Sequence, residues 1–402
     1  MAQGPKKTAS KSIGTIDNLA KALSVTTSEL NAIANTPFSE RYRKITIDKK
    51  AGGSRIVYDA TYPVRRIQKK INERIFKLLV EWPNYLFGSL PNTKKTNSSG
   101  ESSTIRRDYI ACAQCHCGAK SILKLDVANF FDNIHIDTVT KIFSGFLKFP
   151  EQVSDMLANI CCYDDRLIQG ALTSSYLASL CMWELEKDLV STLNRRNLTY
   201  TRLVDDITIS SKYRKFDFKT AESHVIAMML KEDLPLNYSK KEILRCGIKP
   251  LTVHGLIVDF ETPRLNPSEI SKIRAAVHNT VKAASINNYR TTSTFREQYN
   301  RTLGRVNKLA RVKHNKHLIL LKKLQTVQPL PSTRDIKYVR FAINWLRNAT
   351  DKSSERYLKR YNNAVYRNGI ISRTFANESS IFKKNLKDLR EKNTVKISTN
   401  NF

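Results

Sequence analysis

The segment of residues 200–210, YTRLVDDITIS, constrains this chain more than any other part of its sequence. Two short runs of β-prone residues flank Asp205 and Asp206, which predicts a β-hairpin with both carboxylates at its tip. Adjacent carboxylates repel each other and are costly unless a cation neutralises them, and hard oxygen ligands of this kind suit Mg²⁺. The alternative is a plain polar turn, because Asp is common in turns.

A second acidic segment comes earlier, at residues 121–134, SILKLDVANFFDNI. Leu123 and Leu125 alternate with Lys124 and Asp126, which predicts a strand with one buried face and with Asp126 near its end. Taken alone, an Asp in this position could simply cap the next helix.

Between these two lies a third segment, residues 167–180, LIQGALTSSYLASL. Gln169 and Gly170 break the chain before a stretch that has apolar residues at helical spacing, so a helix is expected after the glycine. An ordinary glycine turn explains this segment alone. That alternative weakens when the order is considered, because an Asp-bearing strand, a Gln-Gly helix and an Asp-Asp hairpin follow one another.

The formal net charge of the 402-residue chain is +32, from 68 Lys and Arg against 36 Asp and Glu. Such an excess predicts a polyanionic partner, and nucleic acid is the usual one. No stretch approaches the ~20 apolar residues of a membrane-spanning helix, so no membrane partner is expected. The seven cysteines, an odd number, do not indicate a disulfide framework, and a reducing cytoplasm is the expected setting.

The N-terminal region divides into an arm and a helical part. The first 15 residues are basic and small, which predicts a disordered arm rather than a signal peptide. Residues 19–30 have the pattern of a helix-turn-helix, with Thr26 or Thr27 able to cap the second helix. Two short packing helices are the favoured interpretation over a DNA-reading module, because no basic recognition face follows.

Further along, the patterning changes several times. Residues 42–58 predict a β-hairpin, residues 64–80 an amphipathic helix and residues 88–104 a loop. Strands and helices alternate from residue 121 to residue 260. Beyond Pro267 the chain is helical and strongly basic.

In their order and residues, these segments resemble the palm of reverse transcriptases, in particular the bacterial retron enzymes and their relatives in antiphage defence. The likeness covers residues 41–326. The segments that carry it are CAQCH from Cys112, DVANFFDNI from Asp126, NICCYDDRLIQGALTSS from Asn159, TRLVDDITIS from Thr201, LNYSKKEI from Leu236 and VHGLIV from Val253.

The chain departs from the family pattern at three informative places. Leu203 stands where an aromatic residue is usual, Cys112 replaces the Asn of the NAxxH motif, and His254 replaces the Thr of the VTGL motif. A non-retron defence reverse transcriptase that works with a different noncoding RNA therefore stays open beside a retron enzyme.

The resemblance implies an α+β fold of the right-hand polymerase type with a basic helical C-terminal extension. The expected divisions are residues 1–37 for the N-terminal arm and helices, 38–110 for the fingers, 111–260 for the palm with interleaved finger elements, 261–326 for the thumb and 327–402 for the extension.

The resemblance also implies an RNA-directed DNA polymerase that uses dNTPs, a noncoding RNA template and two Mg²⁺ ions, and that yields a DNA product. A homo-oligomer or a companion or effector protein is a further possible partner. The alternatives are a non-catalytic RNA-binding protein on a polymerase-like fold and a group II intron maturase.

The implied site residues fall into four groups. Lys241 is expected to protonate pyrophosphate, and Phe131 is expected to crowd a ribose 2′-hydroxyl. The groups are Asp126, Val127, Asp205 and Asp206 for the metals; Asp126, Asp205, Asp206 and Lys241 for catalysis; Lys50, Arg55, Phe131, Gln169 and Gly170 for the nucleotide; and His116, Val253, His254, Gly255 and Leu256 for RNA or primer.

A cysteine-rich cluster, Cys112, Cys115, His116 and Cys117, invites comparison with a zinc site. Structural zinc sites need four ligands, usually supplied as two half-sites. Here one crowded half-site stands without a clear second one, so thiols without a metal are the favoured interpretation.

Overall fold

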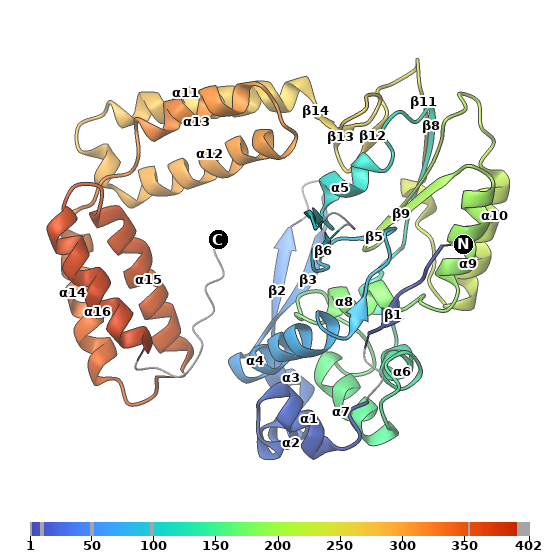
Figure 1. Cartoon of the computed structure of the whole chain (residues 1–402), viewed down its shortest axis with the longest axis horizontal. Coiled ribbons are helices and arrows are strands. Elements are labelled where there is room, and N and C mark those ends of the chain that lie inside the picture. The colour runs from blue at the N-terminus through green and yellow to red at the C-terminus, as the bar shows by residue number, and fades with distance from the viewer. Residues whose placement is uncertain (1, 9–11, 49–51, 97–99, 353, 392–402) are drawn as a thin grey trace. The chain divides into compact units, whose positions relative to one another are not determined.

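The computed structural model describes residues 2–8, 12–48, 52–96, 100–352 and 354–391. The chain divides into two compact units, Met1–Arg264 and Leu265–Phe402. The expected mixture of helices and strands is confirmed, with the strands in the first unit and a purely helical chain after β14 (Arg264–Leu265) (Figure 1).

A five-stranded sheet lies at the centre of the first unit, in the order β11-β8-β10-β9-β5. Its strands are antiparallel except for β5, which pairs in parallel with β9. The sheet therefore joins segments that are far apart in the sequence. The strands are β5 (Leu86–Phe87), β8 (Ser121–Asp126), β9 (Thr199–Leu203), β10 (Asp206–Ser211) and β11 (Glu242–Arg245).

Helices and short strands surround this sheet. The helices are α3 (Phe38–Arg41), α4 (Tyr62–Ile71), α5 (Tyr109–Gln114), α6 (Ile136–Lys141), α7 (Glu151–Cys161), α8 (Ser174–Leu180), α9 (Glu186–Arg195) and α10 (Lys219–Lys231), with single π-helical or 3₁₀ turns at Asn72–Phe76, Phe131–Asn133, Ile142–Phe146 and Tyr238–Lys240. The small strands β12 (Thr252–Val253) and β13 (Leu256–Ile257) form a separate hairpin.

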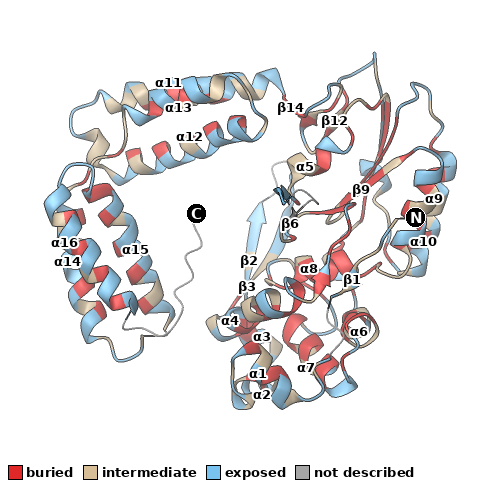
Figure 2. Ribbon diagram, in the orientation of Figure 1, coloured by how far each residue is buried: buried red, intermediate tan, exposed pale blue. Residues whose placement is uncertain are grey.

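The two N-terminal helices, α1 (Ile16–Leu23) and α2 (Thr27–Asn35), pack into the main hydrophobic core. Leu19, Leu23 and Leu30 are fully buried there. Figure 2 shows the buried positions along the ribbon in red. Thr26 caps α2 in a capping box with Glu29, as one of the two expected caps. The interpretation as packing helices is confirmed.

The expected disordered arm is wrong for the residues that the structure describes. Strand β1 (Lys6–Lys7) pairs with β4 (Val80–Glu81), and the Ala2 amide donates to Ser191 Oγ at 3.0 Å. Local composition did not reveal this order, because the partners of the arm lie more than 70 residues away in the sequence.

The expected hairpin after the N-terminal helices is confirmed as β2 (Tyr42–Asp48) and β3 (Ser54–Ala60). The expected loop at residues 88–104 is wrong in part, since β6 (Thr93–Thr96) and β7 (Ser102–Ile105) pair within it. Thr and Ser tolerate extended backbone, so a polar composition alone did not exclude strands.

The second unit consists of two groups of three helices, within which the helices pack on one another. Asp335 joins the two groups, because its buried carboxylate accepts hydrogen bonds from Arg296 on α12 and Arg367 on α15. The first group is α11 (Pro267–Ala284), α12 (Ser293–Arg311) and α13 (Lys316–Gln325); the second is α14 (Thr333–Asn348), α15 (Glu355–Ile371) and α16 (Ala376–Glu391).

Candidate active site

Three carboxylates meet where β8, β9 and β10 adjoin. Asp126, the last residue of β8, is the cross-strand partner of Asp206, the first residue of β10. Asp205 lies in the turn between β9 and β10, and its carbonyl accepts a hydrogen bond of 3.2 Å from the Val127 amide. The turn is tight, because Val204 takes a left-handed conformation with φ of 60°. The predicted strand and hairpin are therefore both confirmed.

The electrostatics around these three aspartates favour a bound cation. Burial, and then the nearby charge of Asp206, raise the pKa of Asp205 above its ordinary value. Asp126 is 8% exposed, and its Oδ2 accepts a hydrogen bond of 2.8 Å from Lys240 Nζ. That hydrogen bond raises the pKa of Lys240. A single ammonium group thus partly neutralises three neighbouring acids.

The oxygen donors of these three residues match the preferences of a divalent metal ion. Three carboxylates supply the hard oxygen ligands that such ions prefer, and their mutual repulsion is relieved by positive charge. Among the described residues, no group of three or more His, Cys, Asp or Glu side chains already converges on one point as a metal site. The chemistry of the donors fits a divalent cation, whereas their side chains are not yet gathered around one.

The two lysines of the LNYSKKEI segment have different partners in the structure. Lys241, the residue expected to act on pyrophosphate, forms an ion pair of 2.5 Å with Glu222. Lys240 contacts Asp126 instead. Lys240 is the last residue of the 3₁₀ turn Tyr238–Lys240 beside β8 and Lys241 follows it, so the role of Lys241 in catalysis stays a prediction.

The expected nucleotide-binding residues come from two elements that lie in contact. The Tyr58 amide on β3 donates a hydrogen bond of 2.8 Å to the Gln169 carbonyl. Gly170 has a φ of 119°, and a Cβ there would lie 2.1 Å from the Tyr58 carbonyl oxygen. Only glycine fits this approach. Arg55 is exposed on β3, opposite Ile47.

Two expected nucleotide contacts are less well defined. Phe131 is half-buried, and its ring centroid lies 6.0 Å from that of Phe130. This packing does not exclude contact with a sugar, so the role of Phe131 stays a prediction. Lys50 lies outside the described residues.

The residues expected to contact RNA or primer are mostly buried. His116, Val253 and Leu256 are each at most 1% exposed, so their side chains have almost no surface to offer RNA. His254 and Gly255 form a two-residue turn between β12 and β13, with φ of 47° and 78°. Positive values at both positions are typical of a type I′ hairpin turn. Gly255 is exposed in this turn and the His254 side chain is 9% exposed, and the contact of all five residues with RNA or primer stays a prediction.

The two unusual motif residues contact each other. Cys112 Sγ lies 3.3 Å from His254 Nε2, and His254 Nδ1 lies 3.6 Å from Asp206 Oδ2. Burial raises the pKa of Cys112 to about 12, so the thiol is neutral. Two of the departures from the family pattern are thus neighbours beside the Asp205–Asp206 hairpin.

The rest of the cysteine cluster does not bring its ligands together. Both ring nitrogens of His116 are engaged, at 2.7 Å, by Ser210 Oγ and Thr201 Oγ1. Burial lowers the pKa of His116 to about 3, which keeps the ring neutral. Cys115 is exposed and Cys117 is half-buried. The absence of zinc stays a prediction.

A buried ion pair beneath the hairpin escaped the sequence analysis. Arg202 on β9 and Glu186 at the start of α9 are 0% and 1% exposed, and Arg202 Nε donates to Glu186 Oε1 at 2.6 Å. Tyr200 also donates to Glu186, and Arg202 Nη1 donates to the Val204 carbonyl at 3.1 Å. An Arg between β-prone residues was the available signal, but its partner lies 16 residues earlier in another element.

Gly88 is a second supporting residue that was missed. Its φ is 120°, and an added Cβ would lie 2.8 Å from a Val204 methyl carbon. The glycine therefore lets the chain pass close to the turn that holds Asp205. Its position in a segment expected to be a loop gave no sign of this role.

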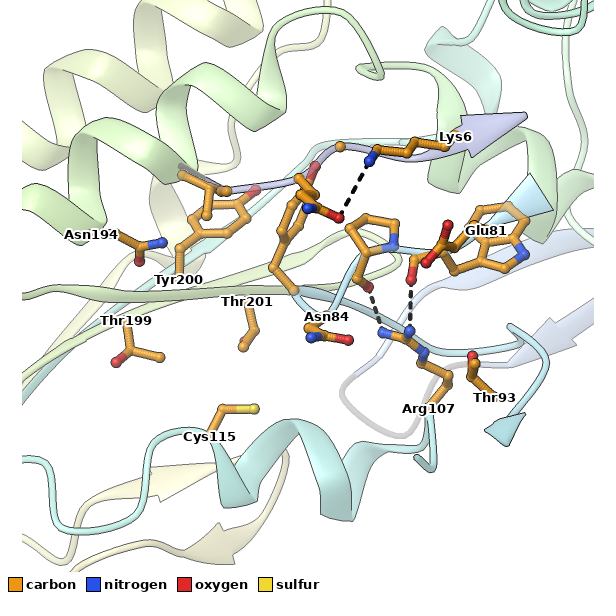
Figure 3. A pocket seen from close by; sticks show the side chains of 17 residues that line it. Lys6, Glu81, Asn84, Thr93, Arg107, Cys115, Asn194, Thr199, Tyr200 and Thr201 are labelled. Carbon is orange, nitrogen blue, oxygen red and sulfur yellow. Dashed lines mark hydrogen bonds between the residues drawn. The ribbon is translucent and has the colours of Figure 1, made fainter. Parts of the chain in front are cut away.

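A cavity of about 470 Å³ lies along the early part of β9, away from the carboxylate end of that strand (Figure 3). Arg107 crosses its wall, where the guanidinium donates hydrogen bonds to the carbonyls of Trp82 and Pro83. Lys6 and Gln3 of the N-terminal arm line it as well. Both Nη atoms of Arg107 are used within the fold, and none of the three aspartates described above lines the cavity.

Comparison with known proteins gives consistent results. Residues 47–296 match the family model described as reverse transcriptase (RNA-dependent DNA polymerase). The chain is 43% identical to the retron Ec48 reverse transcriptase of Escherichia coli, over 94% of this chain and 93% of that protein. It is 27% identical to the retron Se72 reverse transcriptase of Salmonella heidelberg (strain 579083-10), over 93% and 96%.

Among solved structures, apo telomerase from Candida tropicalis matches with a TM-score of 0.41 and 9% identity, over 97% of this chain and 73% of that one. Within the part of the chain that the structure describes, no helix is both long and apolar enough to cross a membrane. The family match includes β3, the three aspartates and the Gln169–Gly170 turn, and the retron Ec48 relative covers nearly the whole chain. The chain therefore belongs to the reverse transcriptase family, as an RNA-directed DNA polymerase of the retron type.

Proposed function

We propose that this enzyme synthesises DNA from dNTPs on a dedicated noncoding RNA, with Asp126, Asp205 and Asp206 holding two Mg²⁺ ions. One observation carries the proposal: Asp126 and Asp206 are cross-strand partners, with Asp205 in the adjoining turn. When bound, two such ions stabilise the attacking and leaving oxygens of an in-line displacement. Reverse transcriptases as a family use divalent metals, and the hard carboxylate donors favour Mg²⁺ among them.

The protein groups around the acids support distinct roles. The Gln169–Gly170 backbone is held in place by the hydrogen bond from Tyr58, and its role is to contact the incoming nucleotide. Phe131, five residues after Asp126, is proposed to crowd the sugar and favour dNTPs. Arg55 is exposed on the hairpin and can reach a triphosphate as a bidentate donor.

We assign proton donation to pyrophosphate to Lys240 in preference to Lys241. Lys240 Nζ already lies 2.8 Å from Asp126, while Lys241 is engaged by Glu222. Comparison of Lys240→Ala with Lys241→Ala tests the assignment through the pH profile of kcat. We expect only Lys240→Ala to remove the alkaline limb, and the reverse result would return the role to Lys241.

A paired substitution tests the metal assignment. Asp205→Asn with Asp206→Asn should abolish labelled dNTP incorporation on the protein's own RNA, since two of three ligands lose their charge. Asp164→Asn with Asp165→Asn is a matched control, because these adjacent acids are exposed in a turn elsewhere. Synthesis that survives the first pair, or that fails equally in both, would contradict the proposal.

The dedicated RNA is supported by the net charge of +32 and by the retron enzymes to which the chain is similar. We extend the proposal to antiphage defence in the bacterial cytoplasm. Specific binding should survive a high-salt wash, because shape and base contacts add to the ionic interaction. Sequencing the retained RNA should give one species; a mixture of ribosomal and transfer RNA would refute a dedicated partner.

Two alternatives have distinct outcomes in the same assays. A non-catalytic RNA-binding protein would retain one RNA without any dNTP incorporation. A group II intron maturase would retain intron RNA instead of a short noncoding RNA.

A further inference from the structure

One face of the second helical group combines aromatic rings with arginines. Tyr338, Phe341 and Trp345 stand at i, i+3 and i+7 along α14 and so share one side of that helix. Arg356 and Arg360 come from the neighbouring helix α15. We call these five residues the aromatic–arginine face.

The rings and guanidinium groups of this face are stacked together. The guanidinium carbon of Arg360 lies 4.3 Å from the Trp345 ring centroid and 5.4 Å from that of Phe341. Arg356 lies 5.4 Å from the Trp345 ring. Such cation–π contacts hold planar groups in a fixed orientation. The face is therefore pre-arranged for a further planar partner.

Packing within the fold accounts for only part of this arrangement, because Tyr338 and Trp345 lie partly buried against the core of the group. The core of the group is made by other residues, among them Val339, Ala342 and Leu346 from α14. Phe341 is 59% exposed, although a large apolar side chain costs free energy in water. Beside it, a hollow of about 340 Å³ is lined by Tyr338, Glu355, Arg356, Lys359, Arg360 and Asn363.

The charge of the face points to a polyanion. Helix α14 carries four basic residues and one acid, and α15 has the same balance. The acid of α14, Asp335, is buried and already bound by Arg296 and Arg367. These hydrogen bonds also join α14 to both α12 and α15, so the two helices that carry the face are held together.

We propose that the aromatic–arginine face binds an unpaired segment of RNA. Exposed bases stack on Phe341, the most exposed ring of the face, and Arg356 and Arg360 contact the phosphates. A duplex hides the faces of its bases and cannot use such a platform. The amide of Asn363 and the hydroxyl of Tyr338 at the hollow are groups that hydrogen-bond a ribose 2′-hydroxyl. This site goes beyond the proposed polymerase reaction, which it does not require.

The test uses the full chain in an Asp205→Asn/Asp206→Asn background, so that its outcome is independent of synthesis. The test variant carries Phe341→Ala, Arg356→Gln and Arg360→Gln. The matched control carries Tyr213→Ala, Lys212→Gln and Arg214→Gln, which also removes one exposed ring and two cations. Melting temperatures verify that both variants fold, and Phe341→Ala alone serves if the triple variant does not.

The probe is a labelled, unstructured RNA oligonucleotide, compared with the same sequence as single-stranded DNA and as an RNA duplex. We expect the test variant to lose about tenfold more affinity for the RNA than the control does, because the loss of stacking adds to an equal loss of charge. Phe341→Trp in place of Phe341→Ala should restore binding of the RNA oligonucleotide.

Equal losses in the two variants would overturn the proposal. Tighter binding of the duplex, or equal binding of the DNA, would overturn the assignment to unpaired RNA. A change of oligomeric state at unchanged RNA affinity would show that the face binds a second copy of the chain instead.

Discussion

The buried ion pair of Glu186 and Arg202 permits a quantitative test, because one substitution of similar size removes a single charge from it. Glu186→Gln keeps the size of the side chain and an oxygen that can accept from Tyr200. It leaves the guanidinium of Arg202 without a counter-charge in a fully buried position. Although burial alone lowers the pKa of Arg202, the charge and hydrogen bonds of Glu186 raise it above its ordinary value, so the arginine stays ionised.

The size of the expected loss of stability follows from the hydrogen bonds that Arg202 keeps and from those that change. Three backbone carbonyls, those of Ala178, Ser179 and Val204, still accept from the guanidinium at 2.9–3.2 Å. The bond of 2.6 Å to Glu186 Oε1 loses its charge assistance, and the bond of 2.8 Å to Oε2 is lost, because an amide NH₂ then faces the guanidinium. Removing one partner of a buried pair costs about 3–5 kcal/mol. A loss of this size lowers the melting temperature by roughly 10 °C in a unit of this length.

Glu184→Gln supplies the matched control, two residues away. Glu184 pairs with Lys141 at 2.5 Å, but its side chain is 40% exposed, and exposed pairs contribute about 1 kcal/mol or less. We expect thermal unfolding to separate the two variants clearly. The double variant Glu186→Gln/Arg202→Met should recover much of the loss, because no unpaired charge remains. If Glu186→Gln melts no lower than Glu184→Gln, the reasoning on burial is refuted.

Three other substitutions test separate contacts. Gly170→Ala should destabilise the enzyme and weaken dNTP binding, because its Cβ would lie 2.1 Å from a carbonyl oxygen. Gly304→Ala is the control: it has open space around it, so thermal unfolding should show no change or a stabilisation of up to about 1 kcal/mol. Asp205 has a raised folded pKa, so its ionised form costs stability above that pKa and the cost disappears as pH falls through it. Asp205→Asn in EDTA should therefore melt higher than wild type at neutral pH and lose the stabilisation by Mg²⁺; a lower melting temperature would contradict this. Phe131→Ala should raise the kcat/KM of NTPs relative to dNTPs, and an unchanged ratio would leave Phe131 as a packing residue only.

Features that depend on neighbouring residues could be predicted from the sequence. Alternation in β8 and the β-prone runs around Asp205 and Asp206 predicted the strand and the hairpin, because the side-chain period of a strand is a local property. Thr26 with Glu29 gave a cap for the same reason. The resemblance then supplied the reaction and the order of the carboxylates, and the family match and the retron relatives confirm the reaction.

Other features required the tertiary structure, because they join residues that no local pattern connects. Lys240 and Lys241 are adjacent and chemically alike, and only the 3₁₀ turn beside β8 decided which one contacts Asp126. Similarly, the fit of Gly170 against Tyr58 depends on two segments more than 100 residues apart. Non-local contacts of this kind arise from packing and from the need to satisfy buried polar groups, neither of which has a period along the chain. The sequence by itself thus determined the strand of Asp126, the hairpin of Asp205 and Asp206 and the expectation that these acids hold metal, whereas the tertiary structure decided which side chains support them.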